Sequence, residues 1–461
     1  MSLRALSLSC LAAAAVAPTA QAAEVQFEGY YRARMRLADS LSLDRTLATN
    51  EGLTWYAQHR LWLRPKLLLS DKAAVFVGIR ALDGVYWGDQ PATYPSPVAN
   101  AAPAFDDGLT APTSDTDSTT PLSDITLWRA WAETYTKIGR FKVGRMPVHW
   151  GTGMWLNDGT SVNPLYADYG DTVDRVSWEL LVQDSFWVHA AADVTAENLV
   201  NERDDTTAWN LGVAYRNEVV AAGLLTRYQH TSNADANGRF NLFSVDITSE
   251  AELGKLNVEG EFIGQFGGGA LPEIGEGVSV TAFGALIDAE IDLEPFKGGF
   301  TFGLATGDGD SNDLRLKTFT FDRDYSVGLF LFEQPMPTLA TITPTDANGG
   351  RSSEETLLGN AVGNAIFFKP RISRTLIPGW RADLSFLGAR VAKVPASFEG
   401  RRSYGMEFGA GVHFDGIEHV DLGLDLGAFV PGSYFREFRG DLGARYDDAV
   451  FGGQLGLRVH F

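Results

Sequence analysis

Apolar side chains recur at every second position in the last segment of the chain. This stripe consists of Phe451, Gly453, Leu455, Leu457, Val459 and Phe461, and the positions between hold Gly452, Gln454, Gly456, Arg458 and His460. Successive side chains of a strand point to opposite faces, so the pattern predicts a strand with one apolar and one polar face. A segment of about ten residues of this kind suits a strand that separates lipid from water. The last strand of a soluble β-sandwich would alternate in the same way.

The same alternation runs through the rest of the chain. Between residues 25 and 37 the odd positions are apolar or small, while Arg32, Arg34 and Arg36 occupy the other face. A helix would scatter these arginines around its circumference, so the period favours a strand. Comparable segments lie near 54–69, 73–83, 124–136, 141–147, 173–183, 186–195, 207–216, 219–230, 240–251, 256–266, 280–292, 299–306, 361–376, 381–393, 403–415, 419–430 and 449–461. The chain is therefore predicted to be all-β, a single transmembrane antiparallel β-barrel of about 18 strands with a water-filled lumen.

The connections between these segments alternate between short and long. Tight polar turns are expected at 70–72, 137–140, 183–185, 217–218 and 378–379. Two connections are much longer, near 84–123 and 307–360, and are rich in Pro, Ser, Thr and Asp. Short periplasmic turns with long extracellular loops are typical of bacterial outer-membrane barrels. Loops of this length are either functional or disordered, and we expect at least one to fold inward and narrow the pore.

The N-terminal residues predict export. Arg4 precedes an apolar stretch from Ala5 to Val16, and Ala20-Gln21-Ala22 follows, so residues 1–22 are predicted to be a signal peptide and 23–461 the barrel domain. The only cysteine, Cys10, lies inside the predicted signal, which leaves no cysteine for a disulfide or a metal site. No later apolar run is long enough for a membrane helix. The expected location is the outer membrane, in contact with lipid and lipopolysaccharide.

Composition narrows the function classes further. The net charge of −20 argues against nucleic acid as a partner, because phosphate binding needs a basic surface. The 49 glycines and the aromatic content of 11% suit a barrel, in which glycine relieves curvature and aromatic rings gather at the membrane interfaces.

Charged residues on the polar faces divide along the chain. Basic positions concentrate in the first third: Arg32, Arg34, Arg36, Arg60, Arg64, Lys66, Arg80, Arg129, Arg145 and Arg175. Acidic positions concentrate later: Asp246, Glu250, Glu259, Glu261, Asp288, Glu290, Glu407, Asp421 and Asp425. Opposed arcs of this kind would set up a field across a pore and attract anions on the basic side. Ion pairing between neighbouring strands is the alternative, and we expect it for the larger share of these charges.

Aromatic residues also fall on polar faces. Tyr30, Trp62 and Trp131 are candidates for stacking on sugar rings beside the arginines. Filling of gaps in the lumen is the alternative explanation for each of them.

Evidence for catalysis or metal binding is weak. The seven histidines are scattered and none lies in a recognised catalytic motif, so we predict neither an enzyme nor a cofactor. The run that contains Asp308, Asp310 and Asp313 offers oxygen ligands for a divalent cation. It lacks the glycine and glutamate of an EF-hand loop, so a solvated acidic loop is the preferred interpretation.

Two stretches resemble known outer-membrane families. The sequence GRMPVHWGTGMWLNDG at 144–159, followed by GDTVDR at 170–175, resembles porin-like barrels of the alginate-export type. The resemblance implies an 18-stranded channel for an anionic exopolysaccharide, in which Arg145 and Arg175 line the lumen, supported by Asp171 and Asp174. The final aromatic residue, Phe461, resembles the signal by which the barrel-assembly machinery recognises its substrates.

The sequence thus predicts an outer-membrane channel for polar or anionic solutes, with an exopolysaccharide as one candidate. An outer-membrane enzyme, or an adhesion or binding scaffold that acts through its long acidic loops, is the alternative.

Overall fold

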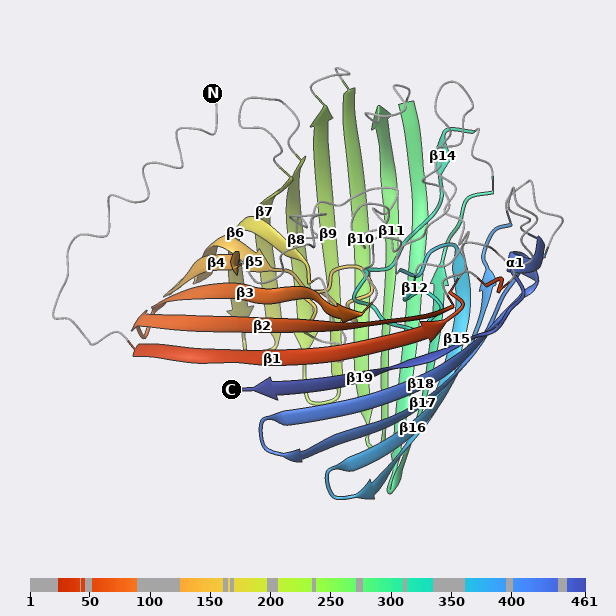
Figure 1. The fold of residues 1–461 in the computed structure, drawn as a ribbon. Coiled ribbons are helices and arrows are strands. Elements are labelled where there is room, and N and C mark those ends of the chain that lie inside the picture. The colour runs from red at the N-terminus through yellow and green to blue at the C-terminus, as the bar shows by residue number, and fades with distance from the viewer. Residues whose placement is uncertain are drawn as a thin grey trace.

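The chain forms one antiparallel sheet that closes on itself (Figure 1). The structure, a computed structural model, describes residues 24–41, 43–45, 52–88, 125–160, 165, 170–196, 206–233, 238–270, 277–309, 313–334, 361–394, 401–437 and 446–461. Its elements are β1 (Glu24–Asp39), β2 (Leu53–Ser70), β3 (Ala73–Gly88), β4 (Ile125–Thr136), β5 (Gly139–Pro147), β6 (Thr172–Val182), β7 (Phe186–Ala196), β8 (Thr206–Arg216), β9 (Val220–Asn233), β10 (Gly238–Leu253), β11 (Leu256–Ala270), β12 (Gly277–Leu293), β13 (Phe296–Ala305), β14 (Arg315–Leu316), β15 (Ala365–Ile377), β16 (Trp380–Val391), β17 (Ser403–Ile417), β18 (Val420–Pro431), α1 (Ser433–Glu437) and β19 (Val450–His460).

Pairing of the first strand with the last closes the barrel. β1 is antiparallel to β2 on one side and to β19 on the other, with Tyr31 opposite Val459. The two-residue β14 pairs only with β12, in parallel, and lies outside the ring. Eighteen strands therefore form the closed barrel, which confirms the predicted fold class and strand number.

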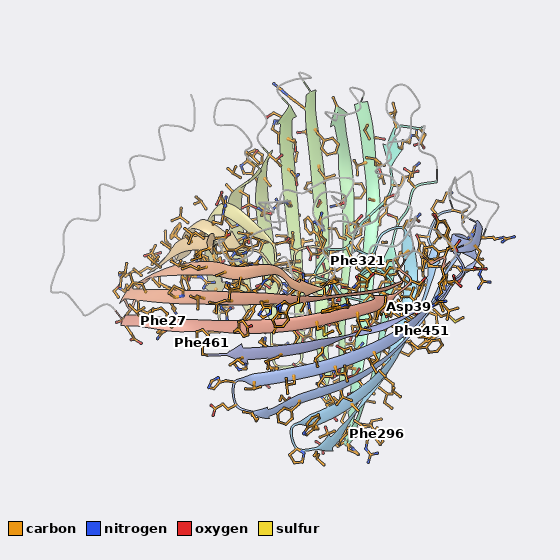
Figure 2. The ribbon with its side chains drawn as sticks, viewed as in Figure 1. Phe27, Asp39, Phe296, Phe321, Phe451 and Phe461 are labelled. Carbon is orange, nitrogen blue, oxygen red and sulfur yellow. The ribbon has the colours of Figure 1, made fainter. Side chains whose placement is uncertain are left out.

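The outer face of the barrel is apolar. Large apolar side chains alternate along the strands and are exposed: Phe27, Met35, Phe243, Ile247, Phe262, Leu384, Phe408, Leu424, Phe451 and Leu455 are examples. Figure 2 shows Phe27 and Phe461 near one end of the β1–β19 seam and Asp39 and Phe451 near the other. A belt of this size is unfavourable in water and requires lipid around it. Among the described residues, no helix has the length and apolar character to cross a membrane.

Short turns join the strands at one end of the barrel, as predicted. They include the turns before β3, β5, β7, β9 and β16. By the usual orientation of bacterial barrels this is the periplasmic end. The predicted signal peptide, most of the 84–123 loop, and residues 335–360 of the second long loop lie outside the described residues.

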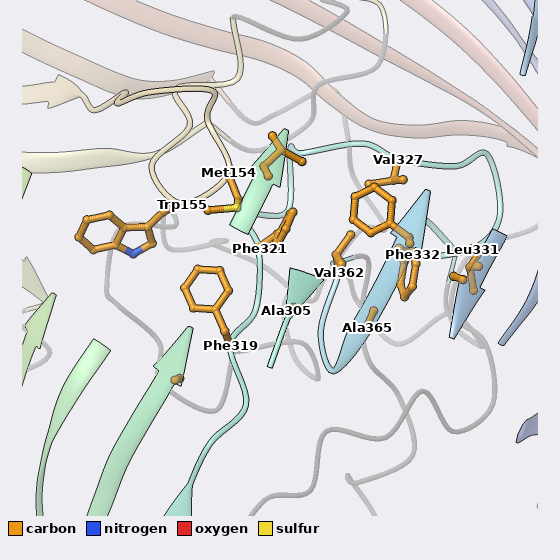
Figure 3. Packing of buried hydrophobic residues seen from close by; sticks show 14 of the residues in the cluster. Met154, Trp155, Ala305, Phe319, Phe321, Val327, Leu331, Phe332, Val362 and Ala365 are labelled. Carbon is orange, nitrogen blue, oxygen red and sulfur yellow. The ribbon is translucent and has the colours of Figure 1, made fainter. Parts of the chain in front are cut away.

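Two segments of the chain occupy part of the lumen, which corrects the prediction of an interior filled with water. The segments 148–159 and 313–334 fold into the barrel and bury an apolar cluster there (Figure 3). Met154 and Trp155 from the first segment pack with Phe321 and Leu331 from the second, and with wall residues such as Phe367. These connections carry apolar side chains that would otherwise face water, so they supply a core of their own. The prediction that at least one long loop folds inward fits the described part of 307–360, whereas the inward position of 148–159 was not predicted.

Gly29 is needed for close packing at the barrel seam. Its backbone exchanges hydrogen bonds of 2.9 and 3.0 Å with Phe461, and a Cβ added at Gly29 would lie 2.8 Å from the Phe461 ring and 2.5 Å from the Trp62 carbonyl oxygen. We expect Gly29→Ala to lower the free energy of unfolding by about 1–3 kcal/mol, as in other overpacked sites. Urea unfolding in detergent would measure it. Gly277→Ala is the matched control, since a Cβ there meets nothing within 4 Å; equal stability of the two variants would contradict the prediction.

Candidate functional site: the channel lumen

Eight cationic side chains lie on the lumen face of β1–β4, and we call them the basic wall. They are Arg32, Arg34, Arg36, Arg60, Arg64, Lys66, Arg80 and Arg129. Strand register brings them together: Arg32 lies opposite Arg60, and Arg80 lies opposite Trp62. Their neighbours of the other parity, such as Met35 and Leu37, are exposed on the outer face. The structure thus gathers eight of the ten basic residues predicted to line the pore.

The basic wall is more exposed to the lumen near Arg64 than near Arg32 and Arg34. The side chains of Arg32 and Arg34 are almost fully buried, whereas the side chain of Arg64 is 43% exposed. Arg34 donates to the Gln58 side chain at 2.6 Å and Arg36 donates to Gln454 at 3.2 Å, so neutral amides support both. Glu28 lies 3.7 Å from Arg64, and this exposed pair is expected to contribute little stability.

Trp62 organises the basic wall rather than binding a sugar. Its side chain is only 3% exposed, and the guanidinium groups of Arg64, Arg80 and Arg129 lie 5.2–5.4 Å from its ring centroid. Tyr30 packs edge-on against the same ring at 5.5 Å. Cation–π contacts therefore occupy the ring, which corrects the prediction of sugar stacking for Trp62 and Tyr30. The sequence pattern could not separate the two roles, since both place an aromatic residue beside arginines.

Trp131 lies two residues after Arg129 on β4, directly opposite Phe76 of β3. Its ring stacks on Phe76 with centroids 4.7 Å apart and an angle of 3° between the planes, and its Nε1 donates to Glu133 at 2.9 Å. The Lys66 ammonium lies 5.2 Å from the Phe76 ring centroid. Sugar stacking by Trp131 stays a prediction.

Arg129 connects the basic wall to residues 148–159, which we call the first inward segment; residues 313–334 are the second. It donates to the Thr172 hydroxyl at 3.2 Å and to the backbone carbonyls of Asp158 and Asp171 at 3.1 and 3.3 Å. The Asp171 carboxylate accepts a hydrogen bond from the Asn157 backbone at 2.9 Å. Both residues thus hold the segment that begins after β5. Asp171 therefore supports this segment, whereas the resemblance had implied that it supports Arg175.

Arg145 and Asp174 lie on the outer face, which corrects their prediction as lumen residues. They pair with each other at 2.6 Å. Arg145 lies on the same face of β5 as the exposed Val143, and Asp174 lies on the same face of β6 as the exposed Val176. Arg175 does face inward, but its partner is Asp193 at 2.7 Å. Asp193 also accepts from Arg227 at 2.9 Å, and the sequence analysis did not single out Asp193.

The acidic residues of β10–β12 face the basic wall from the opposite side of the barrel, and two of them anchor the first inward segment. The Trp150 indole donates to Asp246 at 3.0 Å, and the backbone and hydroxyl of Thr152 both donate to Glu261 at 2.6 Å. Asp288 pairs with Arg371 at 2.7 Å. Anchoring of loops therefore accounts for part of the acidic arc, in addition to the expected ion pairs.

Glu407 on β17 anchors the second inward segment. Its carboxylate accepts hydrogen bonds from the backbone N–H groups of Leu329, Phe330 and Leu331 at 2.5, 3.1 and 2.8 Å. The carboxylate is buried, so these charge-assisted bonds replace its hydration. Glu407 faces inward because Met406 and Phe408 are exposed on the other face.

A cavity of about 420 Å³ lies between the tip of the first inward segment and the barrel wall. Its lining includes Trp150, Trp187, Glu250 and Glu259, and the two indole rings are 6.1 Å apart. Arg216 pairs with Glu250 at 3.3 Å at its edge. This cavity therefore combines apolar ring faces with carboxylates on the side of the lumen opposite the basic wall.

The acidic run after β13 contacts a lysine. The Lys317 ammonium lies 2.7 Å from Asp313 and 3.7 Å from Asp308, and the hydrogen bond to Asp313 raises the pKa of Lys317. Asp310 lies outside the described residues. With this cation already paired to two of the three carboxylates, the structure favours the interpretation as an acidic loop.

Comparison with known proteins finds likeness in structure only. No protein-family model matches the chain, and no curated protein sequence matches it. The chain is similar to OccAB1 of Acinetobacter baumannii, with a TM-score of 0.55 and 10% identity over 95% of this chain and 97% of that one. It is also similar to OccK9 (OpdG) of Pseudomonas aeruginosa, with a TM-score of 0.52 and 11% identity over 95% and 99%. OpdQ of the same organism gives 0.50 and 8% over 95% and 97%.

The closed 18-strand barrel and its apolar outer face define the class of protein. It is a closed antiparallel β-barrel with an outer face suited to lipid, and it shares this fold with the outer-membrane channels named above. A likeness to alginate-export barrels is not found among the neighbours described. At these identities the neighbours inform the fold, so the function has to be inferred from the residues of this chain.

Proposed function

We propose that this protein is a channel that favours the passage of small anionic solutes along the basic wall. The observation that carries the proposal is the lumen face of β1–β4. Eight cations lie on it, three of them around Trp62, while the carboxylates of β10–β12 lie across the barrel. Such an arrangement gives a solute a favourable path on one side and a repulsive wall on the other. Arg64 is exposed, and Lys66 and Arg36 are half-buried, whereas the other five members are buried.

A small solute fits this lumen better than a polysaccharide. The segments 148–159 and 313–334 occupy part of the interior and are fixed to the wall by Glu261 and Glu407. A polymer would need a continuous wide path, and displacing these segments would expose their apolar cluster to water.

Planar-bilayer recordings of the purified protein in a KCl gradient test the proposal. We expect a stable conductance with a reversal potential that indicates chloride preference. In proteoliposome swelling, a small carboxylate should enter faster than a neutral sugar of similar size. A closed protein, or equal entry rates for the two solutes, would reject the proposal.

A further inference from the structure

A second cluster of ionisable side chains faces the lumen on β16–β18, which β19 separates from β1 of the basic wall. It consists of Asp383, His413 and Asp425, one residue from each strand. The His413 Nε2 atom lies 3.0 Å from Asp383 Oδ1 and 3.3 Å from Asp425 Oδ1. Neighbours of opposite parity, such as Leu384 and Leu424, are exposed on the outer face, so the cluster faces inward. Among the described residues, this is the group whose donor atoms converge as metal ligands would.

We propose that Asp383, His413 and Asp425 form a binding site for a divalent transition-metal ion of the zinc type. The donor set of one imidazole and two carboxylates suits Zn²⁺ and its neighbours in the series better than Ca²⁺ or Mg²⁺, which prefer oxygen ligands alone. Donors held at about 2.1 Å on a tetrahedral ion lie about 3.4 Å apart, close to the separations between His413 and the two carboxylates. An ion could therefore enter with small side-chain movements.

Strand register explains why the three donors meet. Gly411 lies directly opposite Asp383 on one side and Asp425 on the other, and His413 is two residues further along the same strand. A Cβ added at Gly411 would lie 2.7 Å from both oxygens of Asp383 and 2.8 Å from Oδ1 of Asp425. Gly411 has no positive φ, so the backbone does not require glycine there. The missing side chain instead leaves the space into which both carboxylates lean.

The surroundings support a bound ion. The Gln454 amide donates to Asp425 Oδ2 at 3.4 Å, which leaves Oδ1 directed toward His413. Hydrogen bonds of this kind orient metal ligands. Three protein ligands would leave one coordination position open toward the lumen, where water or a solute carboxylate could bind. His413 is six residues from Glu407 on β17, about 20 Å along the strand, so the site lies on the periplasmic side of the second anchor.

Calorimetric titration of the purified full chain in detergent, stripped with a chelator and then given ZnCl₂, tests the site. We expect one ion per chain with micromolar affinity or better. Asp383→Asn and His413→Gln should each weaken this affinity by an order of magnitude or more. His230→Gln is the matched control, because His230 contacts the amide of Asn241 and should leave binding unchanged.

Protection of the wild-type protein gives a test that does not depend on variants folding. Zn²⁺ should protect His413, but not His230, from modification by diethylpyrocarbonate, as read by mass spectrometry. Absence of binding, absence of this protection, or equal affinity in folded His413→Gln would overturn the proposal. In that case the role of His413 would be to link Asp383 and Asp425 by ion pairs within the barrel wall, without a metal ion.

Discussion

Glu407→Ala is expected to raise the single-channel conductance several-fold and to make it unstable in time. The Glu407 carboxylate accepts three backbone N–H groups of residues 329–331, and alanine would leave these donors buried without their acceptor. Each hydrogen bond to a charged group contributes about 1.5–3 kcal/mol, so the second inward segment would lose its main polar anchor. Planar-bilayer recording of the variant measures both the mean conductance and its fluctuations.

The control for this experiment is Glu418→Ala. Glu418 lies on a periplasmic turn, and its side chain is 89% exposed, so the variant removes the same charge without touching the inward segment. The heat-dependent gel shift of both variants would establish that the barrel is folded. Wild-type conductance in a folded Glu407→Ala barrel would show that the apolar cluster alone holds residues 313–334 in place.

Reversal of charge on the basic wall is expected to remove the anion preference. Arg64→Glu combined with Lys66→Glu changes the lumen charge by four units next to Trp62 and Phe76. Both side chains are partly exposed, so the substitutions should perturb folding less than changes at the buried Arg32 or Arg34. We expect the ratio of chloride to potassium permeability to fall several-fold, measured from reversal potentials in a KCl gradient.

Lys137→Glu combined with Lys255→Glu carries the same change of charge on periplasmic turns and serves as the matched control. Charges at the mouth act through solvent and are screened within about 8–10 Å at physiological salt, so their effect should be much smaller. If the two double variants shift the reversal potential equally, the basic wall does not determine selectivity.

The sequence predictions agree best with the structure for properties that the residues of one strand decide, namely the bounds of the strand and the face on which a residue lies. The segment predicted at 54–69 is β2 (Leu53–Ser70), and the inward direction of Arg32, Arg34 and Arg36 follows from the exposed residues between them. Arg145 was misplaced because β5 has only nine residues, too few for the pattern to fix which face a residue near its end occupies. Trp62 was placed on the correct face, but its neighbours on β3 and β4 decided its role.

The sequence by itself determined the strands and which face of each is apolar, and the alternation together with the short and long connections and the predicted signal peptide favoured a lipid-facing barrel of about eighteen strands. Alternation is a local property, because the residues of each strand carry it. A sheet with an apolar outer face in lipid must close into a barrel, because a free edge would leave backbone N–H and C=O groups without hydrogen bonds. Only the tertiary structure decided that the segments 148–159 and 313–334 fill part of the lumen, that Glu261 and Glu407 hold them, and that Asp383, His413 and Asp425 meet over Gly411. Those contacts join residues far apart in the sequence, and their geometry depends on strand register and loop packing, which no periodic pattern records.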